Sequence, residues 1–256
     1  MTRYNRDNYI KSDTPLKSDL LKLFNKKDRL VILDIGGCEG EESIKYSRLF
    51  PFSTIFIFEP LPNNLELIKK HINKYQVNNV ELIPFAVSNK KGISHFHVSS
   101  GHPKEQADDL DWDFGNKSSS LLQPNINNNP DWLDFNKKID VETIMLKDFI
   151  IERNLKEIDF IHMDVQGAEL KVLKGAKDYL ENVKAIWLEV SNIELYKNQP
   201  LTTDVEVFMK SKGFTLVKSV FEGDFGDQFY VNKRYYKTFS FFNKSYQLYF
   251  KKSTKK

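Results

Sequence analysis

Cysteine is nearly absent from this 256-residue chain, and so are long apolar runs. The single cysteine, Cys38, excludes an intramolecular disulfide and fits a reducing compartment. No apolar run approaches the ~18 residues that a membrane span needs. Residues 1–13 are polar and lack the apolar centre of a signal peptide. Together these absences predict a cytoplasmic protein.

The chain also has little net charge, a formal +3, but that charge is unevenly spread. Residues 233–256 contain eight Lys or Arg and no Asp or Glu, which leaves 30 basic and 35 acidic residues in the remainder. A mildly acidic body argues against nucleic-acid binding. The tail carries an aromatic stripe at helical spacing, formed by Tyr235, Phe239, Phe242, Tyr246 and Tyr249. This helix is expected either to pack on its own domain or to lie on an anionic membrane surface or a partner. The sequence carries no signal for the oligomeric state.

Short apolar runs alternate with amphipathic segments, which predicts an α/β fold with a doubly wound, mostly parallel sheet. Two further strands at the carboxyl end, separated by an acidic and glycine-rich turn, predict an antiparallel hairpin. The seven expected strands are Leu30–Ile35, Thr54–Phe58, Val80–Phe85, Ile158–Asp164, Ala185–Val190, Phe214–Val220 and Gln228–Val231.

The sequence divides into three parts. Residues 1–28 are polar with weak apolar periodicity, and we expect a helical extension there that caps the sheet edge. Residues 29–232 form the main domain, and residues 233–256 the tail. Within the main domain, residues 99–138 are rich in Asp, Asn, Ser, Gly and Pro. A loop of this length is uncommon unless it is functional or disordered, so we predict a cover over the substrate, with a surface loop as the alternative.

A glycine-rich turn follows the first strand and contains Gly36, Gly37 and Gly40. A buried strand that leads through such a turn into a helix is typical of proteins that bind a nucleoside-containing cofactor. Glu59 lies about 23 residues past Gly36, the approximate spacing at which an acid accepts hydrogen bonds from ribose hydroxyls. That spacing suits NAD and S-adenosylmethionine equally.

The composition of the turn favours the second cofactor. It reads Gly-Gly-Cys-Glu-Gly instead of Gly-x-Gly-x-x-Gly, and Glu39, Glu41 and Glu42 would repel a pyrophosphate. A cationic sulfonium would tolerate that acidity. An NAD-dependent sugar oxidoreductase or epimerase remains an alternative, although the chain lacks a Tyr-x-x-x-Lys pair. A non-catalytic nucleotide-binding domain is a second alternative. The presence of all three strand-end acids, Asp34, Glu59 and Asp164, argues against it.

The motifs, taken in order, resemble the FkbM family of S-adenosylmethionine-dependent methyltransferases over roughly residues 30–232. The most specific of them is Asp-Val-Gln-Gly-Ala-Glu at 164–169. The others are Leu-Asp-Ile-Gly-Gly-Cys-Glu-Gly (33–40), Phe-Glu-Pro-Leu-Pro (58–62), Phe-Ala-Val-Ser-Asn (85–89), Ser-Ser-Ser-Leu (118–121) and Leu-Lys-Gly-Ala (173–176). The resemblance implies a class I methyltransferase fold with a Rossmann-like, seven-stranded sheet. It also implies methylation of a hydroxyl oxygen on a sugar, a glycan or a secondary metabolite.

The resemblance further implies how the cofactor is held. It assigns Asp34 and the turn glycines Gly36, Gly37 and Gly40 to the methionine end of S-adenosylmethionine. Glu59, with Pro60, is assigned to the ribose, and Ala86 and Val87 to the adenine. The chain departs from the family at Gly37-Cys38, where Ala-Asn is commoner, and at His162, where Lys is more frequent.

Asp164 is the first candidate for the catalytic base, since it ends the fourth strand beside the presumed methyl position; anchoring of the cofactor or the loop is the alternative. His162 shares that strand face by the period of two and is expected to bias the charge of Asp164 or relay its proton, unless it is an ordinary core histidine. Glu189 is another acid near a strand end. The candidate acceptor contacts are Gln166, Glu169, His102, Trp112, Ser119 and Ser120. For Glu169, partnership with the helix dipole is an equal alternative. No metal site is predicted, because the acidic run at 108–113 lacks the glycine and distal Glu of a calcium loop.

Overall fold

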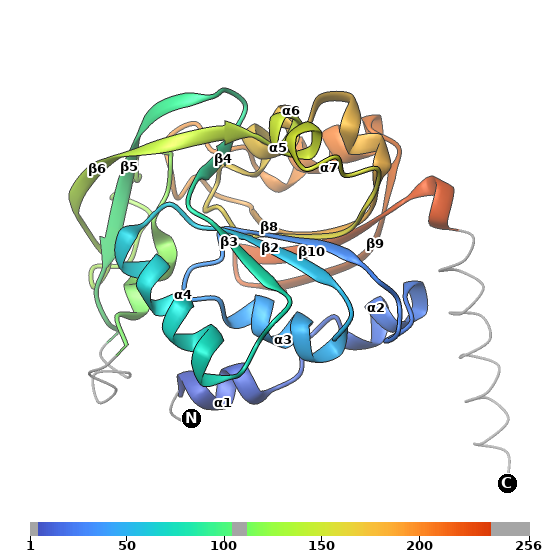
Figure 1. Ribbon diagram of the computed structural model, residues 1–256. Coiled ribbons are helices and arrows are strands. Elements are labelled where there is room, and N and C mark those ends of the chain that lie inside the picture. Colours follow the sequence, from blue (N-terminus) through green and yellow to red (C-terminus); the bar gives the residue numbers. More distant parts are fainter. Residues whose placement is uncertain (1–4, 104–111, 237–256) are drawn as a thin grey trace, which may run out of the picture.

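A seven-stranded sheet forms the centre of the computed structural model, which describes residues 5–103 and 112–236 (Figure 1). The strand order is β3-β2-β1-β7-β8-β10-β9. The first five strands are parallel, and β10 runs antiparallel to both of its neighbours. The strands are β1 (Val31–Ile35), β2 (Thr54–Phe58), β3 (Val80–Ile83), β7 (Ile158–Met163), β8 (Val183–Ser191), β9 (Phe214–Glu222) and β10 (Phe225–Asn232). The predicted doubly wound sheet with its closing hairpin is therefore confirmed.

Helices cover both faces of this sheet because its strands are apolar on both sides. Ile161 and Met163 of β7 belong to the core under one helix layer, and Phe160 belongs to the core under the other. The first layer contains α5 (Leu146–Glu152), α6 (Glu169–Gly175) and α7 (Thr202–Ser211). The second contains α1 (Arg6–Lys11), α2 (Lys17–Leu23), α3 (Glu41–Leu49) and α4 (Pro62–Lys74).

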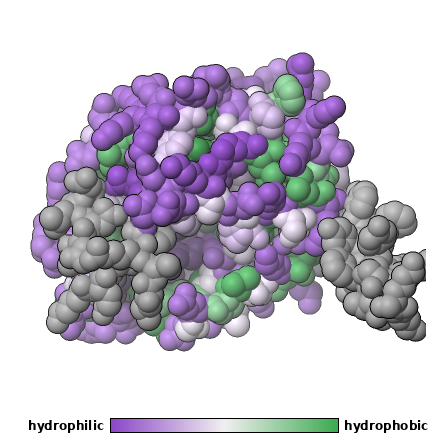
Figure 2. Space-filling model, turned by 90° about the horizontal axis from the view of Figure 1, so that it is seen from below, coloured by the Kyte–Doolittle hydropathy of each residue, from purple (hydrophilic) through white to green (hydrophobic). Residues whose placement is uncertain are grey.

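The outer surface of the second layer is mostly hydrophilic, with separate hydrophobic patches (Figure 2). Among the described residues, no helix combines the length and the apolar character that crossing a membrane requires.

The amino-terminal segment forms two helices instead of one. Leu16, Leu20 and Phe24 of the α2 region are buried in the same core as Phe160. This segment therefore covers a face of the sheet, and the expectation that it caps the sheet edge is wrong. The first helix, α1, packs against α3.

A second, three-stranded sheet with the order β4-β6-β5 flanks the predicted cover, of which only residues 99–100 and 134–138 belong to its strands. Its strands are β4 (Ala86–Ser88), β5 (Gly92–Ser100) and β6 (Asp134–Met145), and a short 3₁₀ helix, η2 (Phe114–Ser118), lies between β5 and β6. Helix α5 begins at Leu146, since Ile144 and Met145 still pair with β4. Helix α6 is followed by a 3₁₀ helix, η3 (Lys177–Asn182).

The start of the tail contacts the main domain. The Tyr235 hydroxyl donates a hydrogen bond to Glu157, and the Lys184 ammonium lies 5.4 Å from the centre of the Tyr235 ring. The rest of the predicted stripe, from Phe239 to Tyr249, lies outside the described residues, as does the acidic run at 108–111.

Candidate functional site

The glycine turn after β1 is held between the ends of β2 and β7. The backbone N–H groups of Gly36 and Gly37 donate to the Phe58 carbonyl over 3.0 and 3.1 Å, and the Asp164 N–H donates to the Ile35 carbonyl over 3.0 Å. Gly36 has φ +87°, and a Cβ there would lie 1.8 Å from the Asp164 carbonyl oxygen. Only glycine fits this contact, so the sequence of the turn sets how closely the ends of β1 and β7 approach.

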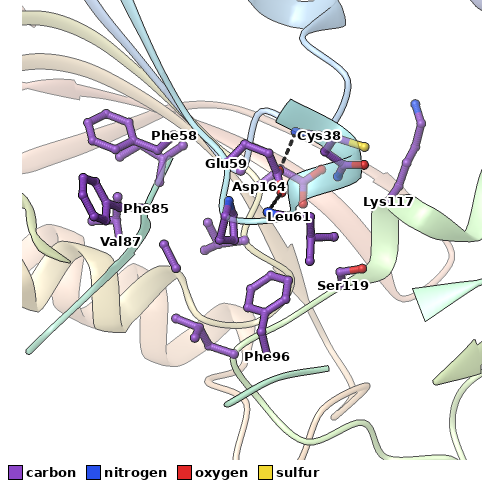
Figure 3. Close-up of a pocket in the computed structure, with 17 residues that line it drawn as sticks. Cys38, Phe58, Glu59, Leu61, Phe85, Val87, Phe96, Lys117, Ser119 and Asp164 are labelled. Carbon is purple, nitrogen blue, oxygen red and sulfur yellow. Dashed lines mark hydrogen bonds between the residues drawn. The ribbon is translucent and has the colours of Figure 1, made fainter. Parts of the chain in front are cut away.

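Glu59 connects this turn to the end of β2. Its two carboxyl oxygens accept hydrogen bonds from the N–H groups of Cys38 at 3.0 Å and Leu61 at 2.8 Å (Figure 3). The side chain is only 4% exposed. Burial raises the pKa of Glu59 to about 8, and the two N–H donors oppose that change without cancelling it. The carboxyl is thus neutral for much of the physiological pH range.

A pocket opens beside Glu59 at the carboxyl ends of β1, β2 and β7. It brings together six of the predicted cofactor and catalytic residues, namely Gly36, Glu59, Pro60, Ala86, Val87 and Asp164. Phe58 and Phe85 add an apolar wall beside Val87, and Lys117 and Ser119 line the opposite side, with Phe96 between the two and nearer to Ser119 (Figure 3). An apolar wall suits an adenine ring, and the carboxyl of Glu59 suits ribose hydroxyls. The residues present therefore fit S-adenosylmethionine.

Three other predicted cofactor residues, Asp34, Gly37 and Gly40, do not line the pocket as it stands. The Asp34 carboxylate lies behind the turn, 3% exposed, and accepts a 2.6 Å hydrogen bond from the Ser43 hydroxyl. Burial raises the pKa of Asp34. In this position Asp34 ties the turn to α3.

His162 lies on the same side as Asp34. Its Nδ1 is 3.8 Å from the Asp34 carboxylate and 3.3 Å from the Tyr46 hydroxyl. Asp164 itself is hydrogen-bonded to the side chain of Gln166, whose Nε2 lies 2.6 Å from Asp164 Oδ1. The contacts of His162 thus run to Asp34 and Tyr46, which is the environment of a core histidine.

The remaining candidates after β7 are buried and hydrogen-bonded within the protein. One carboxyl oxygen of Glu169 accepts the N–H groups of Val165 and Gly167 at 3.1 and 3.3 Å. Burial raises the pKa of Glu169 to about 7. The Ser120 hydroxyl donates to the Gln166 carbonyl over 2.7 Å. Glu169 and Ser120 therefore hold the loop that follows β7.

Of the candidates on the cover, Ser119 lines the pocket and Trp112 does not. Trp112 is 3% exposed and lies between two cations, with the Arg6 guanidinium 5.2 Å and the Lys117 ammonium 4.7 Å from its ring. His102 is half-buried and is not among the lining residues. Trp112 is thus packed in the cover and does not present an open aromatic face to an acceptor.

The cover closes over the pocket through contacts that the sequence did not reveal. The Asn116 amide donates to the Asn64 side-chain oxygen over 2.7 Å, and the Lys117 ammonium lies 3.4 Å from Glu41. The cavity inside measures about 40 Å³, whereas ligand pockets typically enclose roughly 300–1,000 Å³. Lys117 of η2 therefore lies in the wall of a pocket that is narrow in the cofactor-free protein.

The acidity of the turn is largely neutralised in space. Arg6 pairs with Glu39 at 2.7 Å, Lys117 with Glu41 at 3.4 Å, and Lys45 with Glu42 at 2.8 Å. The Tyr9 hydroxyl also donates to Glu42 over 2.5 Å. Cations from α1 and η2, which lie far along the chain, thus offset the acidity on which the sequence-based preference for a sulfonium depends.

Comparison with known proteins places this site in context. Residues 34–216 match the family described as the Methyltransferase FkbM domain. The 2-O-methyltransferase NoeI of Sinorhizobium fredii (strain NBRC 101917 / NGR234) is 34% identical over 218 residues, which are 84% of each chain. Methyltransferase 1 of Beauveria bassiana (strain ARSEF 2860) is 25% identical over 74% of each chain. The solved magnesium protoporphyrin IX methyltransferase of Synechocystis PCC 6803 with bound SAM aligns over 89% of this chain and 79% of that chain, at 8% identity and a TM-score of 0.48.

Proposed function

Because the chain belongs to the FkbM family of S-adenosylmethionine-dependent methyltransferases, as its sequence predicted, we propose that it methylates a hydroxyl oxygen of a sugar, a glycan or a secondary metabolite. The family match confirms the predicted enzyme class and cofactor, and no finding supports the NAD-dependent alternative. The hydroxyl acceptor is supported by the relative named a 2-O-methyltransferase, which is similar over most of both chains.

Asp164 in the wall of the cofactor pocket is the observation that carries the proposal. When bound, S-adenosylmethionine supplies an activated methyl group and leaves as the neutral thioether. The protein's remaining tasks are to align the acceptor and to remove its proton, since the acceptor O–H bond breaks as the new O–C bond forms. A carboxylate at the end of β7 is suited to take that proton, and a positioned base typically contributes ~10²–10⁴-fold.

The other residues act by binding and orienting. Glu59 receives the ribose hydroxyls, and the apolar residues Ala86 and Val87 flank the adenine. Gly36 lets the backbone of the turn approach the cofactor closely. Ser119, on the opposite side of the pocket, is the best-placed of the predicted acceptor contacts.

Replacing Asp164 by Asn tests the proposed base. Asn keeps the shape of the side chain but cannot accept the proton, so we expect turnover to fall ~10²–10⁴-fold. The dissociation constant for S-adenosylmethionine, measured by calorimetry, should stay within about threefold, or ~0.7 kcal/mol. Turnover is followed as release of the demethylated cofactor with a panel of free sugars and glycosides.

Asp159→Asn is the matched control, since Asp159 lies at the opposite end of the same strand and pairs with Lys184. Its turnover per folded molecule should equal that of the wild type. A D164N enzyme with wild-type turnover would remove Asp164 as the base. A wild-type enzyme that binds the cofactor and methylates amines or thiols but no hydroxyl would refute the proposed acceptor.

A further inference from the structure

Three carboxyl groups lie in one row across neighbouring strands at the edge of the sheet that carries the site. Strands β7 and β8 pair with Met163 opposite Leu188, so the next residues, Asp164 and Glu189, are neighbours. Glu189 is in turn directly opposite Asp227 of β10. Directly paired residues project to the same side of a sheet, so the three acids share one face.

Gln166 links the first two acids of this row. Its amide nitrogen donates to Asp164 Oδ1 over 2.6 Å and to Glu189 Oε2 over 2.8 Å. Its amide oxygen accepts from the Tyr196 hydroxyl at 3.0 Å. Both amide hydrogens and the oxygen are engaged, and the backbone of Gln166 has φ +53°. The orientation of this side chain is therefore determined by three contacts.

The surroundings of Glu189 disfavour its ionised form. Burial and the negative charges of Asp164, Glu169 and Asp227 together raise the pKa of Glu189 well above its ordinary value. On the other elements that face it, the Tyr196 hydroxyl has a raised pKa because of burial and these carboxyl groups, and burial raises the pKa of Asp227 to about 6.

The positive charge that acts on this row is that of protonated His162. It lowers the pKa of Asp227, but the effect of burial is larger. Two carboxyl groups that share a site hold one proton between them over a wide pH range. Both side chains are half-buried, but only Asp164 lines the pocket.

We propose that Glu189 is a positioning residue for methyl transfer. Together with the Gln166 amide, it holds Asp164 in place beside the cofactor pocket. Asp164 is then the member of the pair that takes the proton from the hydroxyl group of the substrate. This inference rests on the proposed role of Asp164. The transferred proton leaves both carboxyls protonated, and one proton returns to solvent when the product dissociates.

Two substitutions at the same position test the role in catalysis. Glu189→Gln mimics the neutral carboxyl, since its amide oxygen accepts from Gln166 and its NH₂ donates to Asp164. Its kcat near pH 7 should stay within about threefold of the wild type, or ~0.7 kcal/mol. Glu189→Ala removes the support and should lower kcat about 10- to 100-fold, with the KM for the cofactor changed less than twofold. A Glu189→Ala enzyme with wild-type kcat would overturn the inference.

A titration without cofactor or acceptor tests the shared proton independently. In wild-type protein labelled with ¹³C at side-chain carboxyl carbons, the Glu signals that titrate above the ordinary Glu range should include those of Glu39, Glu59 and Glu169 and one more, and only that additional signal should be missing from Glu189→Gln. In Glu189→Gln, the ionisation seen at high pH when kcat is plotted against pH should be absent. A Glu189 signal that titrates at its ordinary value would overturn this inference alone, whereas a wild-type enzyme that methylates no hydroxyl would overturn the proposed function.

Discussion

Replacing Glu59 by Gln should change how the stability of the cofactor-free protein depends on pH. Burial raises the pKa of Glu59 from the ordinary 4.5 to about 8, so the folded protein binds this proton more tightly than the unfolded chain. The stabilisation from that proton is fully present below the unfolded pKa and is lost as the pH rises through the folded one. One pKa unit corresponds to about 1.4 kcal/mol, so the loss between pH 5 and pH 8 is about 3 kcal/mol.

The amide of Gln does not titrate, so the free energy of unfolding of Glu59→Gln should not fall in this way as the pH rises. It offers one oxygen to the N–H groups of Cys38 and Leu61, both of which donate to Glu59 in the wild type. The unsatisfied donor costs about 1–3 kcal/mol at every pH. We therefore expect Glu59→Gln to be less stable than the wild type at pH 5, and as stable or more stable at pH 8.

Urea unfolding of the cofactor-free proteins at pH 5, 6, 7 and 8, with linear extrapolation, measures this difference. Glu66→Gln is the control, since Glu66 lies on the exposed side of α4 with 74% of its side chain accessible. Its stability should differ from that of the wild type by the same amount at each pH. Parallel curves for Glu59→Gln and the wild type would show that the buried carboxyl is ionised throughout, and the reasoning from burial would fail.

The turn and the cover allow two further tests. Gly36→Ala places a Cβ 1.8 Å from the Asp164 carbonyl oxygen and should abolish cofactor binding in calorimetry. The control is Gly213→Ala, where φ is +82° and the space around the Cβ is open; it should cost only about 1–2 kcal/mol of stability. Equal effects of the two substitutions would exclude the close approach at Gly36 as the cause. Asn116→Ala removes the hydrogen bond to Asn64 and should raise the association rate of S-adenosylmethionine in stopped-flow fluorescence. An unchanged rate would show that this contact does not limit access to the pocket.

The central sheet was predictable because its strands are buried on both sides. Such strands appear in a sequence as continuous apolar runs, and the run predicted from Ile158 to Asp164 corresponds to β7, which ends at Met163. The closing hairpin was equally visible, since its turn is rich in acids and glycine, and Gly223 there has φ +65°.

In the second sheet, β6 was not predictable from local pattern. Strand β6 contains Lys137, Lys138, Asp140 and Glu142, and it forms by pairing with β5 about 40 residues earlier. The start of α7 is a further case, since Thr203 and Glu206 have the spacing of a capping box but do not form one. The helix begins at Thr202, the Asp204 carboxylate accepts the Leu201 N–H, and Glu206 accepts instead from Gln228 of β10.

The site was predictable to the extent that it lies at strand ends. Glu59 and Asp164 follow apolar runs directly, and both line the pocket. The partners that organise Asp164 were beyond sequence reasoning, because Glu189 and Tyr196 reach Gln166 from 23 and 30 residues away. Lys117 and Asn116, which close the pocket, lie in a segment without periodicity, so nothing in their spacing points to α3 or α4.

The preference for a cationic cofactor has a different physical origin from the one that the sequence indicated. Counted along the chain, the negative charge is concentrated in the glycine turn, but Arg6, Lys45 and Lys117 neutralise it there. In the part of the chain that the structure describes, the carboxyls of the strand-end row form no salt bridge with Lys or Arg, and those of Asp164 and Glu189 accept hydrogen bonds from the Gln166 amide. Of the three carboxyls in the row, only that of Asp164 lines the pocket. A sulfonium placed near that carboxylate is stabilised by it, while a pyrophosphate in the same place would be repelled. On the proposed role of Asp164, the end of β7, and not the glycine turn, selects the charge of the cofactor.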